Sequence, residues 1–189
     1  MANEYTIYNE ENAPEEARET LKQVKKAYGF LPNLIGLMAE SPALAKSYTA
    51  LSAAFDETSF SAAEKQTVLL AASYVNECGY CMAAHSTVAQ MTKVPEDVVE
   101  ALRTGQPIQD TKLEALRRLT EEIVVERGWP SELAVENFLD AGYERKHILE
   151  VLVGVAMKTV SNYTNHVADT PLDAAFAANR WDKTAAVVG

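Results

Sequence analysis

Residues 77–86 read ECGYCMAAHS and contain both cysteines of the chain and one of its three histidines. Cys78 and Cys81 are three residues apart, and His85 follows four residues after Cys81. If the segment is helical, this spacing places all three side chains on one face, within about two turns. Two sulfurs at this separation can form a disulfide, and an imidazole one turn further along can accept or return a proton. The stretch therefore predicts a dithiol site on a helix.

The composition is that of an ordinary globular protein, and its 189 residues are enough to bury a sizeable core. We expect a single domain over residues 1–189. A net charge of −10 leaves no basic patch to neutralise phosphates, so we expect no nucleic-acid partner. The longest apolar stretches, 67–75 and 148–157, are far shorter than the roughly 18–20 residues of a membrane span. With no secretory signal in view, we expect a cytoplasmic protein with no membrane partner.

Apolar residues recur at helical spacing along most of the chain, and no segment keeps the alternation of a half-buried strand. Capping-box patterns at Ser61–Glu64 and Thr111–Glu114 mark two helix starts. We therefore predict an all-α protein with an N-terminal arm over about 1–13 and a C-terminal tail over about 181–189. The expected helices span about 14–28, 34–39, 42–55, 61–75, 81–91, 95–103, 111–127, 133–141 and 144–167.

Two of the expected helices share a weak internal similarity. Aligning His166 with His85 places residues 146–160 on residues 65–79. Both segments are buried helical patterns with a histidine shortly after them. The alignment raises the possibility of a duplicated helical unit.

The reactivity of the dithiol depends on a thiolate, because a thiolate rather than a thiol attacks a peroxide or a disulfide. The N-terminus of a helix stabilises negative charge and favours Cys78 as the nucleophile. His85, one turn beyond Cys81, favours Cys81, since it can stabilise the thiolate as an imidazolium or relay its proton. The residues alone leave this choice open. Oxidation of either cysteine to a sulfenic acid would bring the other to form a disulfide.

Simpler interpretations of the same residues exist. The cysteines can be small buried hydrophobes, and His85 can be a core histidine bonded to a carbonyl. The C-x-x-C-x-x-x-H pattern also offers three zinc ligands, but no second C-x-x-C or H-x-x-x-H completes a structural site, so we expect no metal. We expect His147 on the surface and His166 in a structural role near the end of its helix.

The segment 77–86, preceded by the buried helix over 66–75, resembles the AhpD-like branch of the carboxymuconolactone decarboxylase family. The likeness extends upstream to the pattern P-N-L-x-x-L-M-x-x-S-P over 32–42. Downstream it includes N-Y-x-N-H over 162–166 and T-P-L-D over 170–173, which are typical of the peroxidase-related subgroup. The resemblance thus covers most of the chain.

This resemblance implies an all-helical AhpD-like fold, assembly into trimers or hexamers, and peroxide reduction by the two cysteines. It implies that Cys81 reacts with peroxide, that Cys78 is its disulfide partner and that His85 belongs to the proton relay. In the best-studied branch a glutamate twelve residues before the first cysteine begins that relay. Here this position is Gln66, whose amide does not titrate near neutral pH. Glu64 and Glu77 are the nearby carboxylates that could replace it.

We therefore expect a homo-oligomeric thiol-dependent peroxidase that reduces hydrogen peroxide or organic hydroperoxides. We expect no bound cofactor, and an external dithiol, lipoyl or thioredoxin-like, must reduce the disulfide again. One alternative is a redox-sensing or assembly protein whose dithiol is regulatory, an interpretation that Gln66 supports. A second is the lyase activity that names the family, against which the cysteine pair and the lack of a visible cationic cluster argue.

Overall fold

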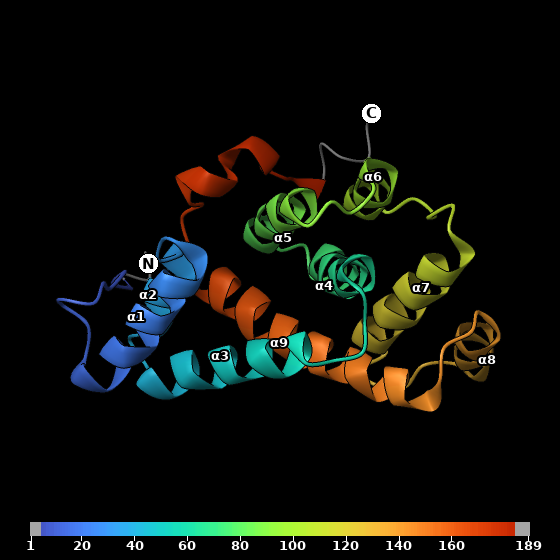
Figure 1. The fold of residues 1–189 in the computed structure, drawn as a ribbon, viewed down its shortest axis with the longest axis horizontal. Helices are drawn as coiled ribbons and strands as arrows, with labels where there is room; N and C mark the ends of the chain where they lie inside the picture. Colours follow the sequence, from blue (N-terminus) through green and yellow to red (C-terminus); the bar gives the residue numbers. More distant parts are fainter. Residues whose placement is uncertain (1–4, 184–189) are drawn as a thin grey trace.

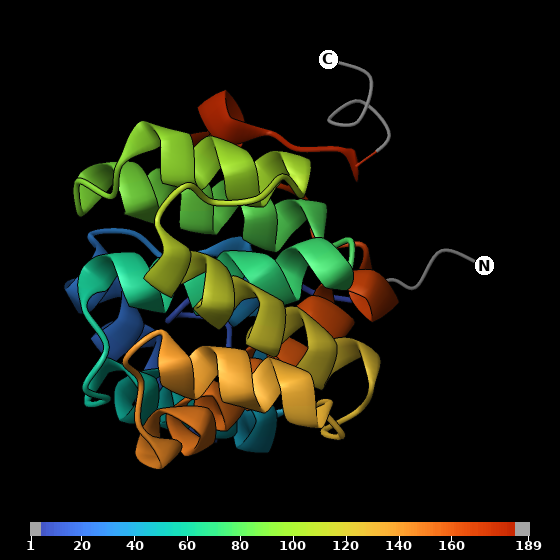
Figure 2. The same ribbon diagram turned by 90° about the vertical axis from the view of Figure 1, so that its right-hand side faces the viewer.

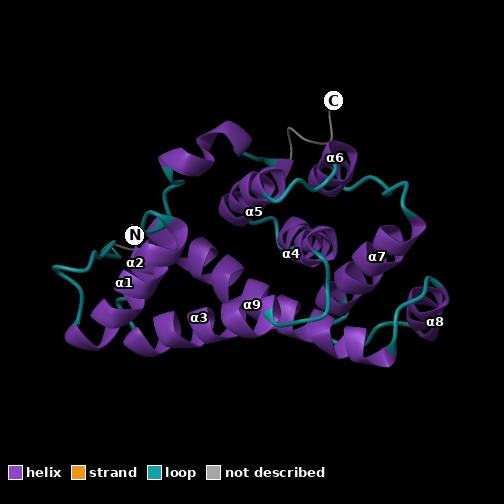
Figure 3. Cartoon of the chain, viewed as in Figure 1, coloured by secondary structure: helices purple, strands orange, loops and turns teal. Residues whose placement is uncertain are grey.

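The computed structural model describes residues 5–183, and within this range every regular element is a helix (Figure 3). The all-α prediction is confirmed. The α-helices are α1 (Glu15–Tyr28), α2 (Asn33–Met38), α3 (Pro42–Asp56), α4 (Ala62–Val75), α5 (Gly79–Met91), α6 (Glu96–Thr104), α7 (Thr111–Val125), α8 (Glu132–Asp140) and α9 (Arg145–Ala168), followed by a short 3₁₀ helix, η1 (Ala174–Asn179).

Helix α4 forms the centre of the structure (Figure 1). It packs against α5, α6, α7 and α9, and its residues 66–73 are all buried. A helix that is apolar nearly all round can be stable only when neighbours cover each of its faces. At its start Ser61 and Glu64 form the expected capping box, which satisfies two otherwise free amides.

The chain breaks sharply between α4 and α5. Glu77 adopts the left-handed conformation with φ of 55°, and the Cys78 amide donates a hydrogen bond to the Ser73 carbonyl at 3.0 Å. The turn leaves Cys78 as the N-cap of α5, which begins at Gly79 rather than at Cys81 as expected. By contrast, α9 runs unbroken from Arg145 to Ala168 through the positions aligned with this turn. The helix boundaries therefore do not support a duplicated helical unit.

The start of α7 differs from its expected form. Asp110 is the N-cap, and its Oδ1 accepts hydrogen bonds from two amides of the first turn. Glu114 instead forms an ion pair with Arg117 at 2.7 Å. The expected capping box of Thr111 and Glu114 is wrong, because a carboxylate one residue earlier caps the helix and a buried guanidinium takes Glu114.

Both terminal segments are attached to the helices. In the expected N-terminal arm, of which residues 5–13 are described, the Tyr8 amide donates to the Gly36 carbonyl at 3.1 Å. Residues 169–181 run along the side formed by α5 and α6 (Figure 2). In the expected tail, Trp181 is buried and its indole N–H donates to the Arg103 carbonyl at 2.7 Å. The remainder of that tail from residue 184 lies outside the described residues.

Over residues 5–183, no helix combines the length and the hydropathy that crossing a lipid bilayer requires.

The closest helix contact in the core predicts one effect on stability. A Cβ added at Gly154 of α9 would lie 2.6 Å from Val68 Cγ1 and 2.8 Å from Phe55 Cε2. Both neighbours are buried, so Gly154→Ala should lower the free energy of unfolding by about 1–3 kcal/mol, despite the better helix propensity of alanine. Denaturant unfolding measures the change. Ala156→Ser, at an exposed position of the same helix, is the control, and a Gly154→Ala variant as stable as wild type would contradict the packing described.

Candidate functional site

The two cysteines lie together at the start of α5. Cys78 and Cys81 are 1% and 2% exposed, and both are free thiols. Because α5 begins at Gly79, Cys81 sits in its first turn and Cys78 caps it. The Cys78 thiol is hydrogen-bonded to the Cys81 sulfur. The expected pair is therefore formed, and its two members have different local environments.

Helix α9 supplies a polar stripe that faces the sulfurs. Lys158, Ser161, Asn162 and Asn165 are buried and recur at helical spacing along a helix that is otherwise largely apolar. Asn165 Nδ2 donates to Cys78 Sγ at 3.5 Å and to Cys81 Sγ at 3.3 Å. Ser161 Oγ lies 3.7 Å from Cys81 Sγ. The Asn165 amide, which donates to both sulfurs, stabilises negative charge on them.

The charges of the site favour a thiolate at Cys81. Burial alone would raise the pKa of Cys81, but the hydrogen bond from Cys78 and the positive charge of Lys158 outweigh it and hold that pKa well below its ordinary value. The hydrogen bond to Cys81 and burial raise the pKa of Cys78, which stays a thiol. The pair therefore consists of one thiolate and one thiol that donates to it.

His85 lies one turn beyond Cys81, and its Nδ1 is 3.2 Å from Gln66 Oε1. Burial, and then the charge of Lys158, lower the pKa of His85 well below its usual value. The ring is therefore neutral near pH 7. Of its two expected roles, that of imidazolium partner to the thiolate falls to Lys158, while proton transfer stays compatible with a neutral ring.

Neither carboxylate that the sequence offered in place of Gln66 contacts His85. Glu64 Oε2 accepts a hydrogen bond from the Ser61 amide at 2.8 Å, and Glu77 forms an ion pair with Lys183 at 2.9 Å. Both side chains are thus engaged elsewhere. Gln66 itself lies next to the His85 ring. The position of the family's glutamate is therefore filled by an amide, which cannot act as a base.

A cavity of about 230 Å³ opens onto Cys81, His85 and Lys158. Its walls are mostly apolar and aromatic, and Cys78 is not among the residues that line it. The aromatic residues of the walls are Tyr28, Phe30, Tyr48, Tyr80 and Phe176. A small organic molecule in the cavity therefore meets Cys81, and Cys78 lies behind it.

One wall of the cavity is held by a buried carboxylate. Tyr80 donates a short hydrogen bond to Asp173 and accepts one from the Leu34 amide at 3.3 Å. Asp173 also accepts from the Asn33 amide at 3.1 Å. These bonds join α2, α5 and the C-terminal segment, from which Phe176 reaches the cavity. Tyr80 is thus a wall of the cavity.

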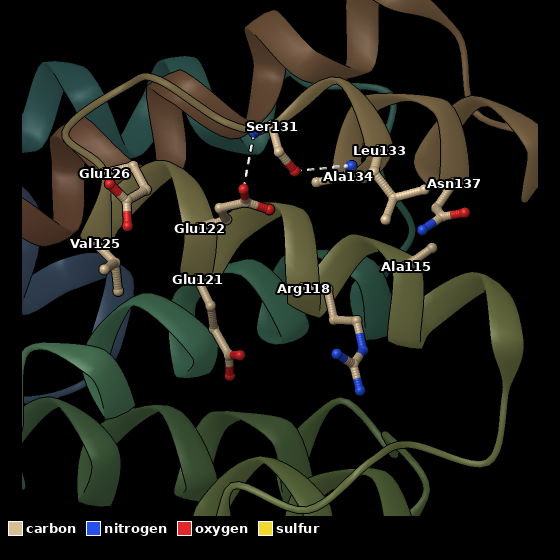
Figure 4. A pocket seen from close by; sticks show the side chains of 10 residues that line it. All are labelled: Ala115, Arg118, Glu121, Glu122, Val125, Glu126, Ser131, Leu133, Ala134 and Asn137. Atoms are coloured by element: carbon tan, nitrogen blue, oxygen red, sulfur yellow. Dashed lines mark hydrogen bonds between the residues drawn. The ribbon is translucent and has the colours of Figure 1, made fainter.

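A larger hollow of about 380 Å³ lies between α7 and α8, away from the cysteines (Figure 4). Arg118, Glu121, Glu122 and Glu126 line it together with small and apolar side chains, and no cysteine or histidine reaches it. Since this hollow contains no thiol that could act as a nucleophile, the smaller cavity at Cys81 is the candidate site.

The other two histidines lie apart from the cysteines. His147 is half-buried and accepts a hydrogen bond from the Glu144 amide at 2.8 Å, so it caps α9 instead of lying free on the surface. His166 is exposed and stacks on Tyr163. Over residues 5–183, no three His, Cys, Asp or Glu side chains converge in a way that could hold a metal ion.

Sequence reasoning missed Lys158, Ser161 and Tyr48. Lys158 is completely buried and is the one Lys or Arg among the described residues that line the cavity. The polar stripe of α9 could have revealed Lys158 and Ser161 from the sequence. Lys158 lies in a largely apolar helix, and polar residues follow it three, four and seven positions later. A buried lysine requires a polar partner.

Comparisons with known proteins agree with this fold. The model of the carboxymuconolactone decarboxylase family matches residues 42–122, which contain Cys78, Cys81 and His85. No curated protein sequence matches the chain significantly.

Several solved structures share the fold over nearly the whole chain. An AhpD-core, uncharacterised peroxidase-related protein from Ralstonia eutropha JMP134 superposes with a TM-score of 0.79 at 17% identity, covering 91% of this chain and 93% of its own. A similar protein from Silicibacter sp. TM1040 has a TM-score of 0.77 at 16% identity, covering 93% of each chain. The debrominase Bmp8 has a TM-score of 0.78 at 20% identity, covering 94% of this chain and 96% of its own.

These identities are low, so the structural likeness establishes the fold alone. The chain therefore has the AhpD-like helical fold, and its residues 42–122 match the model of the carboxymuconolactone decarboxylase family.

Proposed function

We propose that this protein is a thiol-dependent peroxidase that reduces hydrogen peroxide or organic hydroperoxides with Cys78 and Cys81. One observation carries the proposal: the sulfur that faces the cavity, Cys81, is also the one whose pKa is lowered by Cys78 and Lys158. The Cys81 thiolate, which is the nucleophile, therefore faces the cavity that could hold the substrate. Peroxidase-related proteins with the same fold agree with this choice.

The reaction takes two steps at sulfur. The Cys81 thiolate attacks the terminal oxygen of the hydroperoxide, the O–O bond breaks, and Cys81 becomes a sulfenic acid while an alcohol or water is formed. Cys78 then attacks the sulfenic sulfur, and the hydroxyl leaves as water with the proton of the Cys78 thiol. In this proposal neutral His85 carries that proton, and its lowered pKa supports the role. The peroxide gains the two electrons that the dithiol loses.

An external dithiol, lipoyl or thioredoxin-like, completes the cycle by thiol–disulfide exchange. A dithiol of this kind is kept reduced in the cytoplasm, where we place the protein. We also propose that it acts as a homo-oligomer, a trimer or hexamer, in which each chain contributes one cysteine pair.

A second candidate is reductive dehalogenation of a small aromatic compound. It is favoured by the aromatic walls of the cavity and by a cysteine-to-alanine variant of Bmp8, a debrominase solved in complex with 2,3,4-tribromopyrrole, which superposes with a TM-score of 0.74. The dithiol would supply two electrons and a proton, and the products would be the dehalogenated ring, bromide and the disulfide. Bromide release from 2,3,4-tribromopyrrole with no consumption of hydroperoxide would favour this candidate over the peroxidase.

The peroxidase is tested by hydroperoxide consumption, with dithiothreitol as reductant, in wild type, Cys78→Ser and Cys81→Ser. We expect sustained consumption by wild type and loss of at least 100-fold in Cys81→Ser, because no thiolate then faces the cavity. With dithiothreitol removed, Cys78→Ser should consume about one equivalent of hydroperoxide and stop as the sulfenic acid, which a sulfenic-acid probe detects.

Three outcomes of this experiment would count against the proposal. Equal rates in all three proteins would remove the cysteines from the reaction. If Cys78→Ser lost hydroperoxide consumption and Cys81→Ser kept it, Cys78 would be the nucleophile and Cys81 the resolving thiol. Rapid oxidation of wild type by one equivalent, with no turnover for any dithiol, would favour a redox sensor.

The residue beside His85 allows a second test. Gln66→Glu places a carboxylate within 3.2 Å of the imidazole if the side chain keeps its position, and this should raise the pKa of His85 and make the ring a better base. We expect a severalfold higher rate of hydroperoxide consumption and a His85 titration, followed by NMR, that moves to higher pH. Gln23→Glu, on the exposed face of α1, is the control. A folded Gln66→Glu protein with the wild-type rate would mean that His85 does not limit the reaction.

A further inference from the structure

The proposed peroxidase reaction leaves one proton unassigned. Attack by the Cys81 thiolate expels an alkoxide or hydroxide, which is a poor leaving group unless an acid protonates it as the O–O bond breaks. The following inference rests on the proposed function, since it concerns that leaving oxygen. The acid has to lie at the cavity, within reach of a molecule bound to Cys81.

The titratable groups that line the cavity come from four helices. They are Tyr28 on α1, Tyr48 on α3, Tyr80, Cys81 and His85 on α5, and Lys158 on α9, and Cys78 contacts Cys81. Tyr28 is more than half exposed, and Tyr80 donates its proton to Asp173. Burial raises the pKa of Tyr48 above its ordinary value, and the pKa of Cys78 is raised as well, so both are weak acids. His85 has a lowered pKa and is already neutral. Helices α2 and α4 contribute no titratable side chain to the cavity, and their nearest polar group is Gln66.

Lys158 has the position that the missing acid needs. It lines the cavity, it is 0% exposed, and apart from its interaction with the Cys81 sulfur its Nζ has no hydrogen-bond partner in the described part of the chain. Its charge acts on the Cys81 sulfur. An ammonium carries three protons to donate and is costly to bury without partners, so an open donor position on Nζ is available to a bound substrate.

We infer that Lys158 is the general acid of the reaction, giving a proton from Nζ to the oxygen that leaves as Cys81 attacks. The thiolate, the ammonium and the hydroperoxide R–O–O–H become a sulfenic acid, a neutral amine and the alcohol R–O–H. The S–O bond forms, the O–O bond breaks, and the electron pair of that bond takes the lysine proton. When an external dithiol restores the thiolate, the amine takes a proton back.

Charge balance gives the physical reason. The buried thiolate and ammonium neutralise each other before the reaction, and oxidation removes the thiolate charge. If the ammonium kept its proton, the cavity would hold one unpaired buried charge, whose desolvation is unfavourable. Transfer of that proton to the leaving oxygen keeps the cavity neutral throughout.

Lys158 could act as a positive charge that stabilises the thiolate and as an acid that donates a proton. The variant Lys158→Arg distinguishes these two roles. Arginine keeps the positive charge but does not lose a proton in proteins. The readout is the rate at which thiolate absorbance disappears in a single turnover, with tert-butyl hydroperoxide and with peracetic acid. Peracetic acid expels acetate, which needs no proton. We expect Lys158→Arg to lose roughly 100-fold with the hydroperoxide, in the range typical of general acids, and less than threefold with the peracid.

Two further variants make the comparison robust. Lys158→Met should ionise Cys81 only at raised pH, and there it should recover the rate with peracetic acid but stay at least about tenfold slow with the hydroperoxide. Lys146→Met, at an exposed lysine near the start of the same helix, should keep the wild-type ratio of the two rates. An unchanged thiolate titration in Lys158→Arg establishes that the site is intact.

The outcomes separate this inference from the proposed function. Suppose that wild type reacts with both oxidants and that both Lys158 variants keep the wild-type ratio of the hydroperoxide rate to the peracid rate. This result overturns the acid role of Lys158 and leaves the proposed peroxidase activity intact. A wild type that reacts with neither oxidant overturns the peroxidase and the acid role with it.

Discussion

The attraction between the Cys81 thiolate and the Lys158 ammonium is the interaction on which the site depends. Each of these charges alone would be unfavourable in a buried position, and several kcal/mol would be lost for each ion without a partner. Together, and with hydrogen bonds from the Cys78 thiol and the Asn165 amide, they form a neutral group. A pair of this kind adds little to stability but fixes which sulfur is ionised. Its value to the protein therefore lies in reactivity.

The fold can be understood as the means of bringing these two charges together. Cys81 and Lys158 are 77 residues apart in the sequence and lie on α5 and α9, which both pack against the buried helix α4. The left-handed Glu77 turns the chain so that α5, which Cys78 caps, starts beside α9. Asp173 then fixes Tyr80 and α2 around the cavity. The rigid neighbours hold the site open toward one sulfur only.

Much of this arrangement follows from the sequence. The helical spacing and the capping residues give an all-α protein with helix limits mostly within a few residues, and the C-x-x-C-x-x-x-H pattern brings Cys78, Cys81 and His85 to one face. These are local properties, governed by residues a turn apart. The choice between the cysteines is not local. It depends on Lys158, and on the cavity, which reaches one sulfur and leaves out the other.

Other expectations were changed by neighbouring side chains. The expected capping box at Thr111 failed because Asp110 caps α7 and Arg117, one turn further along the same helix, pairs with the Glu114 carboxylate. Of the two roles considered for His85, that of imidazolium is disfavoured by burial, and Lys158 from a distant helix supplies the positive charge, while proton transfer by His85 stays a prediction. The suggested duplication gains no support from the helix boundaries, because α9 is continuous where α4 and α5 are separated by a turn.

The interaction between Lys158 and the Cys81 sulfur also determines the chemistry of the site. A single ionised sulfur at the end of an apolar cavity, with a thiol behind it, suits a two-electron reduction of a small organic molecule.

The most direct test that Cys81 is a thiolate at neutral pH is the ultraviolet titration of thiolate in wild type and in Cys81→Ser, both fully reduced. The account predicts one thiolate in wild type at neutral pH, lost only when the solution becomes acidic, and none in Cys81→Ser. A wild type with no thiolate until the pH approaches the ordinary cysteine value of about 8.5 would contradict it.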